Sequence, residues 1–169
     1  GNGFRGPNLC ISTACAAGTN AIGEAAHIIR YGGADVIIAG GSEAAITTVS
    51  MAGFARMGAL STRRDDPSTA SRPFDATRDG FVMGEGAAFL VLESYENATA
   101  RGATILGAIL GYGRNADAHH ITAPSPDGSG AFNCLELAIS DPQLTPGDIA
   151  HVTAHCPSAP LTPSPGSAA

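Results

Sequence analysis

The apolar run ADVIIAGG at 34–41 is the feature that most constrains the fold. It is continuous and has the length of a single strand, and a strand that is apolar on both faces requires helices on both faces of its sheet. A helical pattern at 15–31 precedes it and ends at Gly32 and Gly33, and a short apolar stretch, LCISTA at 9–14, precedes that helix. The sequence therefore predicts a strand–helix–strand unit within an α/β fold.

The rest of the chain alternates short apolar runs with helical patterns. The expected elements are strands at 87–93, 105–113 and 150–155, helices at 94–102 and 130–141, and mixed helix and loop at 42–60. A long polar loop is expected at 61–80, and loops of that length inside a compact domain are usually functional.

The composition excludes several functions. Of 169 residues, 44% are apolar and 14% are charged, which is enough apolar material for a packed core and argues against disorder. The net charge of −6 argues against a nucleic-acid surface, and no run approaches the roughly 18 apolar residues of a membrane span. The four cysteines form no CxxC pair, which argues against zinc and thioredoxin-like sites. Few cysteines and no signal peptide predict a reducing, cytoplasmic location.

The two ends of the chain differ from the middle. The chain opens without Met in a loop-like sequence, which predicts a fragment or a processed product. The last fourteen residues, 156–169, hold four Pro, three Ser and three Ala and no charged residue. That composition predicts a disordered tail.

Cys15 is the first candidate for chemistry. It lies between the predicted strand and helix, in the small-residue string STACAAG. A strand-to-helix elbow exposes a nucleophile, and amides at the start of the helix stabilise a thiolate or a developing oxyanion. A buried cysteine that acts as a small apolar side chain is the alternative interpretation.

A cysteine nucleophile needs a base or a proton donor, and His155 is the best candidate for that role. It ends a predicted strand, where functional side chains often project from the carboxyl edge of a sheet. A surface histidine is the alternative. His119 and His120 are adjacent and point in opposite directions in an extended segment, which disfavours a shared metal ion. His27 and His151 are expected to pack or to face solvent.

The loop and the glycine-rich segment that follows it allow two further interpretations. Asp75, Arg78 and Asp79 form either an ion-pair cluster that braces the loop or a set of solvated charges. The glycines at 80–86 precede a strand rather than a helix, so they do not form a dinucleotide fingerprint, and the absence of Lys excludes a P-loop. They are expected to form tight turns with close backbone approach.

Several of these strings, taken together, resemble one known family, the β-ketoacyl-acyl-carrier-protein synthases. The similarity is greatest to the synthase II type of bacterial fatty acid synthesis and runs collinearly from about residue 6 to residue 155. The strings that carry it are STACAAG, ADVIIAGGSEA, GFARMGALS, ASRPFDATRDGFVMGEGA, LVLE and NADAHH.

The resemblance implies a thiolase-like α/β fold with layers α/β/α/β/α, in which two related halves pack together, usually as a homodimer. On this basis, residues 1–105 are the later part of the N-terminal half, with the nucleophile elbow. Residues 106–155 begin the C-terminal half, and 156–169 form an aberrant Pro/Ser/Ala-rich tail. The chain then covers the end of the first half and the start of the second.

The resemblance also implies a chemistry, the decarboxylative condensation of an acyl-enzyme thioester with malonyl-acyl carrier protein. Cys15 accepts the acyl group from a carrier protein that bears it on phosphopantetheine, and His155 matches the first of two histidines that stabilise the carbanion and the thioester oxygen. Phe54 resembles a residue that lines the acyl channel, and His120 and Thr122 resemble a loop at the channel mouth. The family needs no metal or redox cofactor, and it implies no nucleic-acid or membrane partner.

The basic side chains offer a further expectation about the carrier. An acidic carrier protein favours a basic docking surface, which the net charge does not supply globally. Arg56, Arg63 and Arg64 are candidates for local contacts, with a solvated face as the alternative.

The chain departs from the family's pattern after His155. The family has Gly-Thr-Ser-Thr-Pro there, and this chain has CPSAP at 156–160, so the two threonines that resemble pantetheine-binding positions are absent. Either an error at the end of a partial sequence or a real loss accounts for this. The family's catalytic Lys, its second His and its second oxyanion-hole amide have no counterpart either. We therefore expect the isolated chain to fold poorly and to be inactive.

Two other functions stay open. The ketosynthase of an aromatic (type II) polyketide synthase shares the motifs. A non-catalytic, truncated or vestigial protein is the alternative of another class, favoured by the altered segment at 156–160. A chain-length-factor-like subunit is disfavoured, because such subunits lack the nucleophile that Cys15 supplies.

Overall fold

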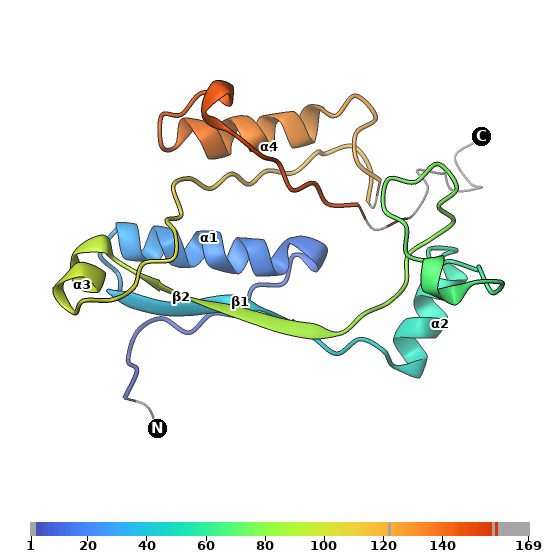
Figure 1. The fold of residues 1–169 in the computed structure, drawn as a ribbon, viewed down its shortest axis with the longest axis horizontal. Helices are drawn as coiled ribbons and strands as arrows, with labels where there is room; N and C mark the ends of the chain where they lie inside the picture. The colour runs from blue at the N-terminus through green and yellow to red at the C-terminus, as the bar shows by residue number, and fades with distance from the viewer. Residues whose placement is uncertain (1–2, 122, 157, 159–169) are drawn as a thin grey trace. The chain divides into compact units, whose positions relative to one another are not determined.

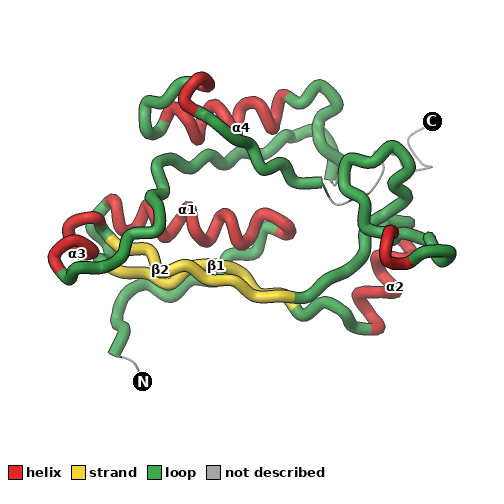
Figure 2. The backbone as a smooth tube through the Cα atoms, in the orientation of Figure 1, coloured by secondary structure: helices red, strands yellow, loops and turns green. Residues whose placement is uncertain are grey.

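The computed structural model describes residues 3–121, 123–156 and 158. The chain divides into two compact units, one made of Gly1–Ser42 and Ala87–Ala150 and the other of Glu43–Gly86 and His151–Ala169. Figure 1 labels the helices and strands, and Figure 2 shows which segments are loops.

The first unit is built on a helix that covers one face of a two-stranded sheet. Helix α1 (Ala17–Arg30) lies along strands β1 (Val36–Glu43) and β2 (Gly86–Glu93) (Figure 1). Gly18 of α1 lies close to Gly41 of β1, since a Cβ at Gly41 would lie 3.3 Å from the Gly18 Cα. Helix and strand therefore pack through backbone at this point, which two glycines permit.

The two strands run antiparallel. The Ser94 backbone N–H donates to the Asp35 carbonyl at 3.1 Å, and a Cβ at Gly40 would overlap the Ala88 carbonyl. Residue numbers therefore rise along one strand as they fall along the other. Helix α3 (Tyr95–Ala100) follows β2 directly, and the Ser94 side chain caps it by accepting the Asn97 N–H at 3.2 Å.

A second helix of this unit, α4 (Ser129–Ser140), is tied to α1 by a single arginine. The Arg30 guanidinium pairs with the Asp141 carboxylate at 2.7 Å and donates to the Leu110 carbonyl at 2.9 Å. The segment that precedes α4 in the chain approaches this helix at Gly111 and Gly113. A Cβ at these glycines would overlap the carbonyls of Ala138 and Cys134. Only glycine fits this crossing.

The second unit contains helix α2 (Thr48–Arg56) and the long loop after it. The Thr47 hydroxyl caps α2 by accepting the Ser50 N–H at 3.2 Å. Phe54 of the helix packs edge-to-face on Phe81, with ring centroids 5.2 Å apart, and Leu60 forms a parallel bridge with Phe81.

Most of the predicted elements are present. The structure contains the helices and strands expected near 15–31, 34–41, 87–93, 94–102 and 130–141, and α2 lies within the mixed region at 42–60. The long loop holds only the short 3-10 turn Pro67–Thr69.

Three predicted strands are wrong. Residues 9–14, 105–113 and 150–155 are not strands in the structure, and Figure 2 draws the first two as loop along most of their length. A strand exists only when a neighbour completes its hydrogen-bond ladder, and apolar composition does not supply that neighbour. The strand–helix–strand unit therefore has only its helix and its second strand.

The predicted burial of β1 on both faces is also wrong. Along β1, Ala39 is 7% exposed, whereas Val36 and Ile38, which alternate with it, are 41% and 55% exposed. The side of β1 toward α1 is covered and the other is open, as the period of two requires. Phe89 of β2 is likewise 57% exposed. Of the described helices, none is long and apolar enough to cross a membrane.

The crossing of Tyr112 over α1 leads to a stability prediction. A Cβ at Gly23 would overlap the Tyr112 ring, whereas one at Gly53 of α2 meets nothing within 4 Å. We expect Gly23→Ala to lower the free energy of unfolding by about 1–3 kcal/mol through overpacking. The matched Gly53→Ala should raise it by up to about 1 kcal/mol, because alanine favours a helix. Thermal denaturation followed by circular dichroism, at low protein concentration, measures both. Equal stability of the two variants would contradict the packing described.

Candidate functional site

The nucleophile candidate, Cys15, lies on a tight turn at the entrance to α1. A 3-10 turn, Ala14–Ala16, runs directly into the helix, and Cys15 is exposed at its centre. Ala14 has φ 51°, a left-handed conformation that costs a non-glycine residue of order 1–3 kcal/mol. The strand-to-helix elbow expected from the sequence is thus a loop-to-helix elbow, and the expected buried-cysteine alternative is not what the structure shows.

The surroundings of Cys15 suit an attack on a thioester. The first amides of α1 lack partners within the helix, and its dipole favours negative charge at this end. The neighbouring side chains are small, so an acyl carbonyl can approach the sulfur closely. These features together can stabilise a thiolate and a developing oxyanion.

The other predicted site residues are distributed over both units. His120 lies with Cys15 in the first unit, where its Nδ1 accepts the Ala123 N–H at 3.1 Å. Phe54 and His155 lie in the second unit; Phe54 is half-buried against Phe81 and His155 is exposed. Thr122 lies outside the described residues. Within the described part of the chain, no group of three or more His, Cys, Asp or Glu residues is placed to hold a metal ion.

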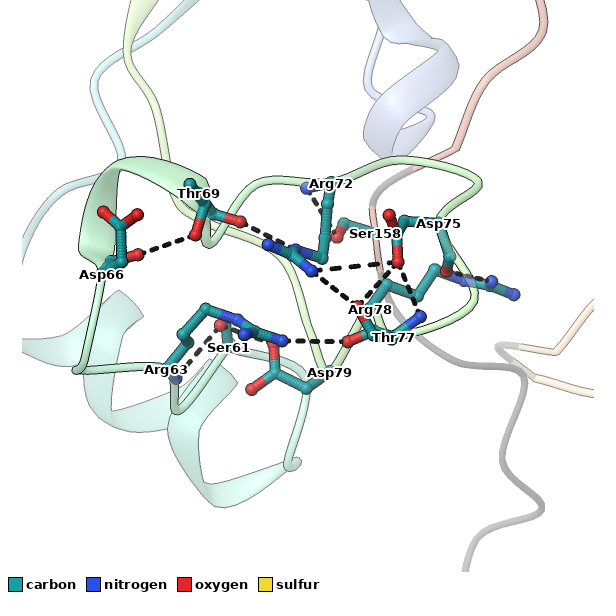
Figure 3. A network of polar contacts seen from close by, with 10 residues as sticks. All are labelled: Ser61, Arg63, Asp66, Thr69, Arg72, Asp75, Thr77, Arg78, Asp79 and Ser158. Atoms are coloured by element: carbon teal, nitrogen blue, oxygen red, sulfur yellow. Dashed lines mark hydrogen bonds and ion pairs between the residues drawn. The ribbon is translucent and has the colours of Figure 1, made fainter.

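Carboxylates brace the long loop of the second unit, as the first of the two interpretations of Asp75, Arg78 and Asp79 predicted. They do so through hydrogen bonds more than through ion pairs. The Asp79 carboxylate accepts from the Ser61 hydroxyl at 2.6 Å (Figure 3). It also accepts from the Thr62 N–H at 3.0 Å, so that Asp79 joins the two ends of the loop. Asp75 accepts from the Thr77 N–H at 2.7 Å and lies 3.9 Å from Arg72. The backbone of the loop is therefore fixed largely by its own side chains.

Arginines complete this network. Arg72 donates to the Thr69 carbonyl at 2.8 Å, and Arg78 donates to the Asp75 carbonyl at 2.8 Å. Arg63 is half-buried and donates to the Thr77 carbonyl at 3.1 Å. Arg63 is thus used inside the loop, whereas Arg56 and Arg64, the other two candidates for carrier contacts, are exposed.

Ser158 also belongs to this network, although the composition of the tail predicted disorder at this residue. It is 1% exposed, and its hydroxyl accepts the Arg72 N–H at 3.1 Å (Figure 3). Its carbonyl accepts the Gly80 N–H at 3.2 Å. The expected disordered tail is therefore wrong at this residue; 157 and 159–169 lie outside the described residues. The signal that could have found Ser158 is its match to the serine of the family's Gly-Thr-Ser-Thr-Pro string.

Cys156, the residue that departs from that string first, has a distinctive environment. The backbone N–H groups of Ser158 and Phe74 lower the pKa of its thiol, and the Arg78 guanidinium adds to the effect. Phe74 itself has φ 66°, which turns the loop toward this position. A half-buried thiol therefore lies next to the exposed His155.

Comparison with known proteins decides the family. The family model of the β-ketoacyl synthase N-terminal domain matches residues 2–98, and that of the C-terminal domain matches 106–163. The chain belongs to the β-ketoacyl synthase family. The family expected from the motifs is confirmed, and so is the expected thiolase-like α/β fold.

Named relatives and solved structures agree with this assignment. The chain is 54% identical to 3-oxoacyl-[acyl-carrier-protein] synthase 2 of Synechocystis sp. and 52% identical to that of Vibrio cholerae, in each case over 94% of this chain and 38% of the relative. It therefore spans well under half the length of these relatives. A β-ketoacyl synthase from Burkholderia phymatum superimposes with a TM-score of 0.84 at 46% identity, over 89% of this chain and 36% of that one. A type II PKS ketosynthase, solved in complex with its acyl-carrier protein, gives 0.87 at 42% identity, over 89% and 37%.

The loop network yields a pH prediction. Hydrogen bonds from Ser61 and from the Thr62 N–H lower the pKa of Asp79 below its ordinary 3.8. A carboxylate with a lowered pKa stabilises the fold above its unfolded-state pKa, and this stabilisation is lost as the pH falls through the folded-state value. We expect Asp79→Asn to lower the melting temperature at about pH 6, and the difference from the unsubstituted chain to shrink as the pH falls below the ordinary carboxyl pKa of 3.8 and through the lower folded-state pKa. Asp65→Asn, at an exposed position in the same loop, is the control. A difference in melting temperature that does not depend on pH would contradict the assignment of this stabilisation to the Asp79 carboxylate.

Proposed function

We propose that this chain carries the nucleophile-bearing part of a β-ketoacyl-acyl-carrier-protein synthase that elongates fatty acids by two carbons. The observation that carries the proposal is the exposed Cys15 on the turn before α1, in a chain 52–54% identical to synthases of that name. A reactive cysteine at a helix entrance is what acyl transfer requires.

In the first half-reaction Cys15 is the nucleophile. Its thiolate attacks the thioester carbonyl of an acyl group on a carrier protein, and the tetrahedral intermediate places negative charge on the oxygen. The backbone amides at the start of α1 are the donors nearest in sequence to that charge. The intermediate collapses, the carrier's sulfur leaves as a thiolate that takes up a proton equivalent to the one Cys15 lost, and the acyl group is held as a thioester of Cys15.

The second half-reaction forms the carbon–carbon bond. Malonyl-carrier protein loses CO2, and the electron pair of the broken bond becomes a carbanion at the α-carbon. That carbon attacks the carbonyl of the acyl-cysteine, the Cys15 thiolate is expelled, and a 3-ketoacyl chain two carbons longer remains on the carrier. We assign His155 to the stabilisation of the carbanion and the thioester oxygen, supported by its place in the family's motif order.

The remaining site residues receive roles near the substrate. We assign Phe54 to the wall of the acyl channel, and His120 and Thr122 to the mouth through which the carrier's phosphopantetheine enters. The complex in which a related ketosynthase binds its own acyl-carrier protein supports the choice of partner. We further propose a homodimer in the cytoplasm, and a division at about residue 105, supported by the separate matches of the two family models.

The isolated chain is proposed to be inactive. The exposed apolar sides of β1 and β2 and the 38% share of the relatives' length support this. Apolar surface of that kind favours association with other surfaces rather than a stable monomer. The rest of a synthase would cover these faces and supply the second histidine and the lysine.

A polyketide ketosynthase is the second candidate. The solved type II PKS ketosynthase, at a TM-score of 0.87, supports it. The length of the acyl chain and the set of substrates that the enzyme accepts separate the two candidates.

A chimeric synthase tests the proposed function. In it, residues 3–155 of this chain replace the matching segment of the Synechocystis relative, to which the chain is 54% identical. We expect the chimera to convert an acyl primer and malonyl-carrier protein into the 3-ketoacyl product, measured by mass spectrometry. Cys15→Ser should lower the rate by about 10³-fold or more, because the acyl-enzyme cannot form at a useful rate. Cys10→Ser, five residues away, is the matched control and should leave the rate unchanged.

A second chimera tests the non-catalytic alternative. It extends the replacement to residue 160 and so includes the altered segment, and a third version restores the family string by Cys156→Gly, Pro157→Thr and Ala159→Thr. Loss of activity in the second chimera and recovery in the third would assign the loss to this segment. A folded first chimera that forms no product, with Cys15 intact, would contradict the proposed function.

A further inference from the structure

A tyrosine from far along the chain lies across the middle of α1. Tyr112 lies more than eighty residues after the end of α1 at Arg30. Its ring nevertheless packs on Gly23 of that helix, where any Cβ would overlap it. The ring also meets His27 edge-to-face, with centroids 5.3 Å apart at 69°. Gly23 and His27 are one turn apart on one face of α1, so the ring is held along that face.

Charged groups fix the same ring from its open side. The Arg114 guanidinium lies 5.9 Å from the ring centroid and forms an ion pair with Glu24 of α1. Burial raises the pKa of the Tyr112 hydroxyl, and the nearby Glu24 carboxylate raises it further. The hydroxyl therefore remains protonated at neutral pH and is available as a donor.

That hydroxyl donates to the Asn20 side chain, which in turn reaches the nucleophile turn. Tyr112 Oη lies 3.1 Å from Asn20 Oδ1, and Asn20 Nδ2 donates to Thr13 Oγ1 at 2.7 Å. Because the tyrosine is the donor in the first bond, the Asn20 oxygen faces Tyr112 and its NH2 faces Thr13. The orientation of the amide is thus fixed from one end.

Thr13 is the residue from which the Cys15 turn starts. Its carbonyl accepts the Ala16 N–H at 3.2 Å, so the turn closes around Ala14 and Cys15. Ala14 is held at φ 51°, a conformation that persists only when its surroundings enforce it. The hydrogen bond from Asn20 to the Thr13 side chain is a contact from outside the turn that restrains the residue before Ala14.

We propose that Asn20 and Tyr112 are positioning residues for Cys15, which act through Thr13 to hold the nucleophile turn in its strained conformation. The proposal rests on the proposed function of Cys15 in acyl transfer. It assigns to residues outside the family strings a role in the rate of the first half-reaction. Loss of the relay would let Ala14 relax, so that Cys15 would spend less time in the geometry that attacks.

The experiment measures single-turnover acyl transfer to Cys15 in the chimeric synthase ending at residue 155. Thr13→Val and Asn20→Leu each remove the Asn20–Thr13 bond and should lower the acylation rate about tenfold, with KM for the acyl thioester within about twofold. Tyr112→Phe removes only the bond that orients the amide and should lower the rate about threefold. Thr13→Ser keeps the hydroxyl and should restore the rate to within about twofold of the unsubstituted chimera. Thr19→Val, at an exposed site on the same helix, is the matched control and should have no effect.

The double variant Thr13→Val/Asn20→Leu distinguishes positioning from general destabilisation. If Asn20 acts through Thr13, the double variant is no slower than the slower single variant. The proposal would be overturned if the rate losses of the two single variants multiplied in the double variant. It would also be overturned if Thr13→Ser were as slow as Thr13→Val, or if only KM changed.

A second readout separates this proposal from the proposed function. The rate of Cys15 alkylation by iodoacetamide, resolved by peptide mass spectrometry and divided by that of Cys134, needs no acyl substrate. If the chimera fails to accept an acyl group, the proposed function fails, and the same ratio still tests the relay. A fall of the ratio in Thr13→Val and Asn20→Leu, with recovery in Thr13→Ser, supports the relay. An unchanged ratio overturns it.

Discussion

The placement of Cys15 depends on the backbone contact between α1 and β1. Gly18 and Gly41 carry no Cβ, so helix and strand meet where a side chain on either would lie within 3.3–3.8 Å of the other backbone. Directly before this contact the chain enters the helix through a very short turn that contains the left-handed Ala14. Exposure of the thiol at the start of the helix follows from this geometry, and the chemistry proposed for Cys15 depends on it.

The elements with strong local signals could be predicted from the sequence. The pattern of α1 and the apolar runs of β1 and β2 were sufficient, because helix periodicity and strand length are local properties. The strands expected at 9–14, 105–113 and 150–155 were not found, because a ladder depends on a neighbour elsewhere in the chain. The predicted burial of β1 on both faces was wrong for the same reason. Val36 and Ile38 are apolar, but whether they are covered depends on layers that a strand's own sequence does not specify.

The candidate site shows the same division. Cys15 could be predicted from a motif and its position before a helix, and the family from several motifs in order. The contributions of Asn20, Tyr112 and Ser158 could not, because each acts on a residue more than five positions away, and in two cases more than seventy. In the sequence, Tyr112 is one of several apolar residues of the strand predicted at 105–113. Only the fold shows that it packs on Gly23.

The most direct test of the account is to locate the acyl group. The chimera carrying residues 3–155 is incubated with an acyl-carrier protein thioester in the absence of malonyl donor, and the modified cysteine is identified by peptide mass spectrometry. We expect an acyl adduct on Cys15 that forms at least about tenfold faster than on Cys10 or Cys134. Acylation spread evenly over these three cysteines, or absent from Cys15 in folded protein, would contradict it.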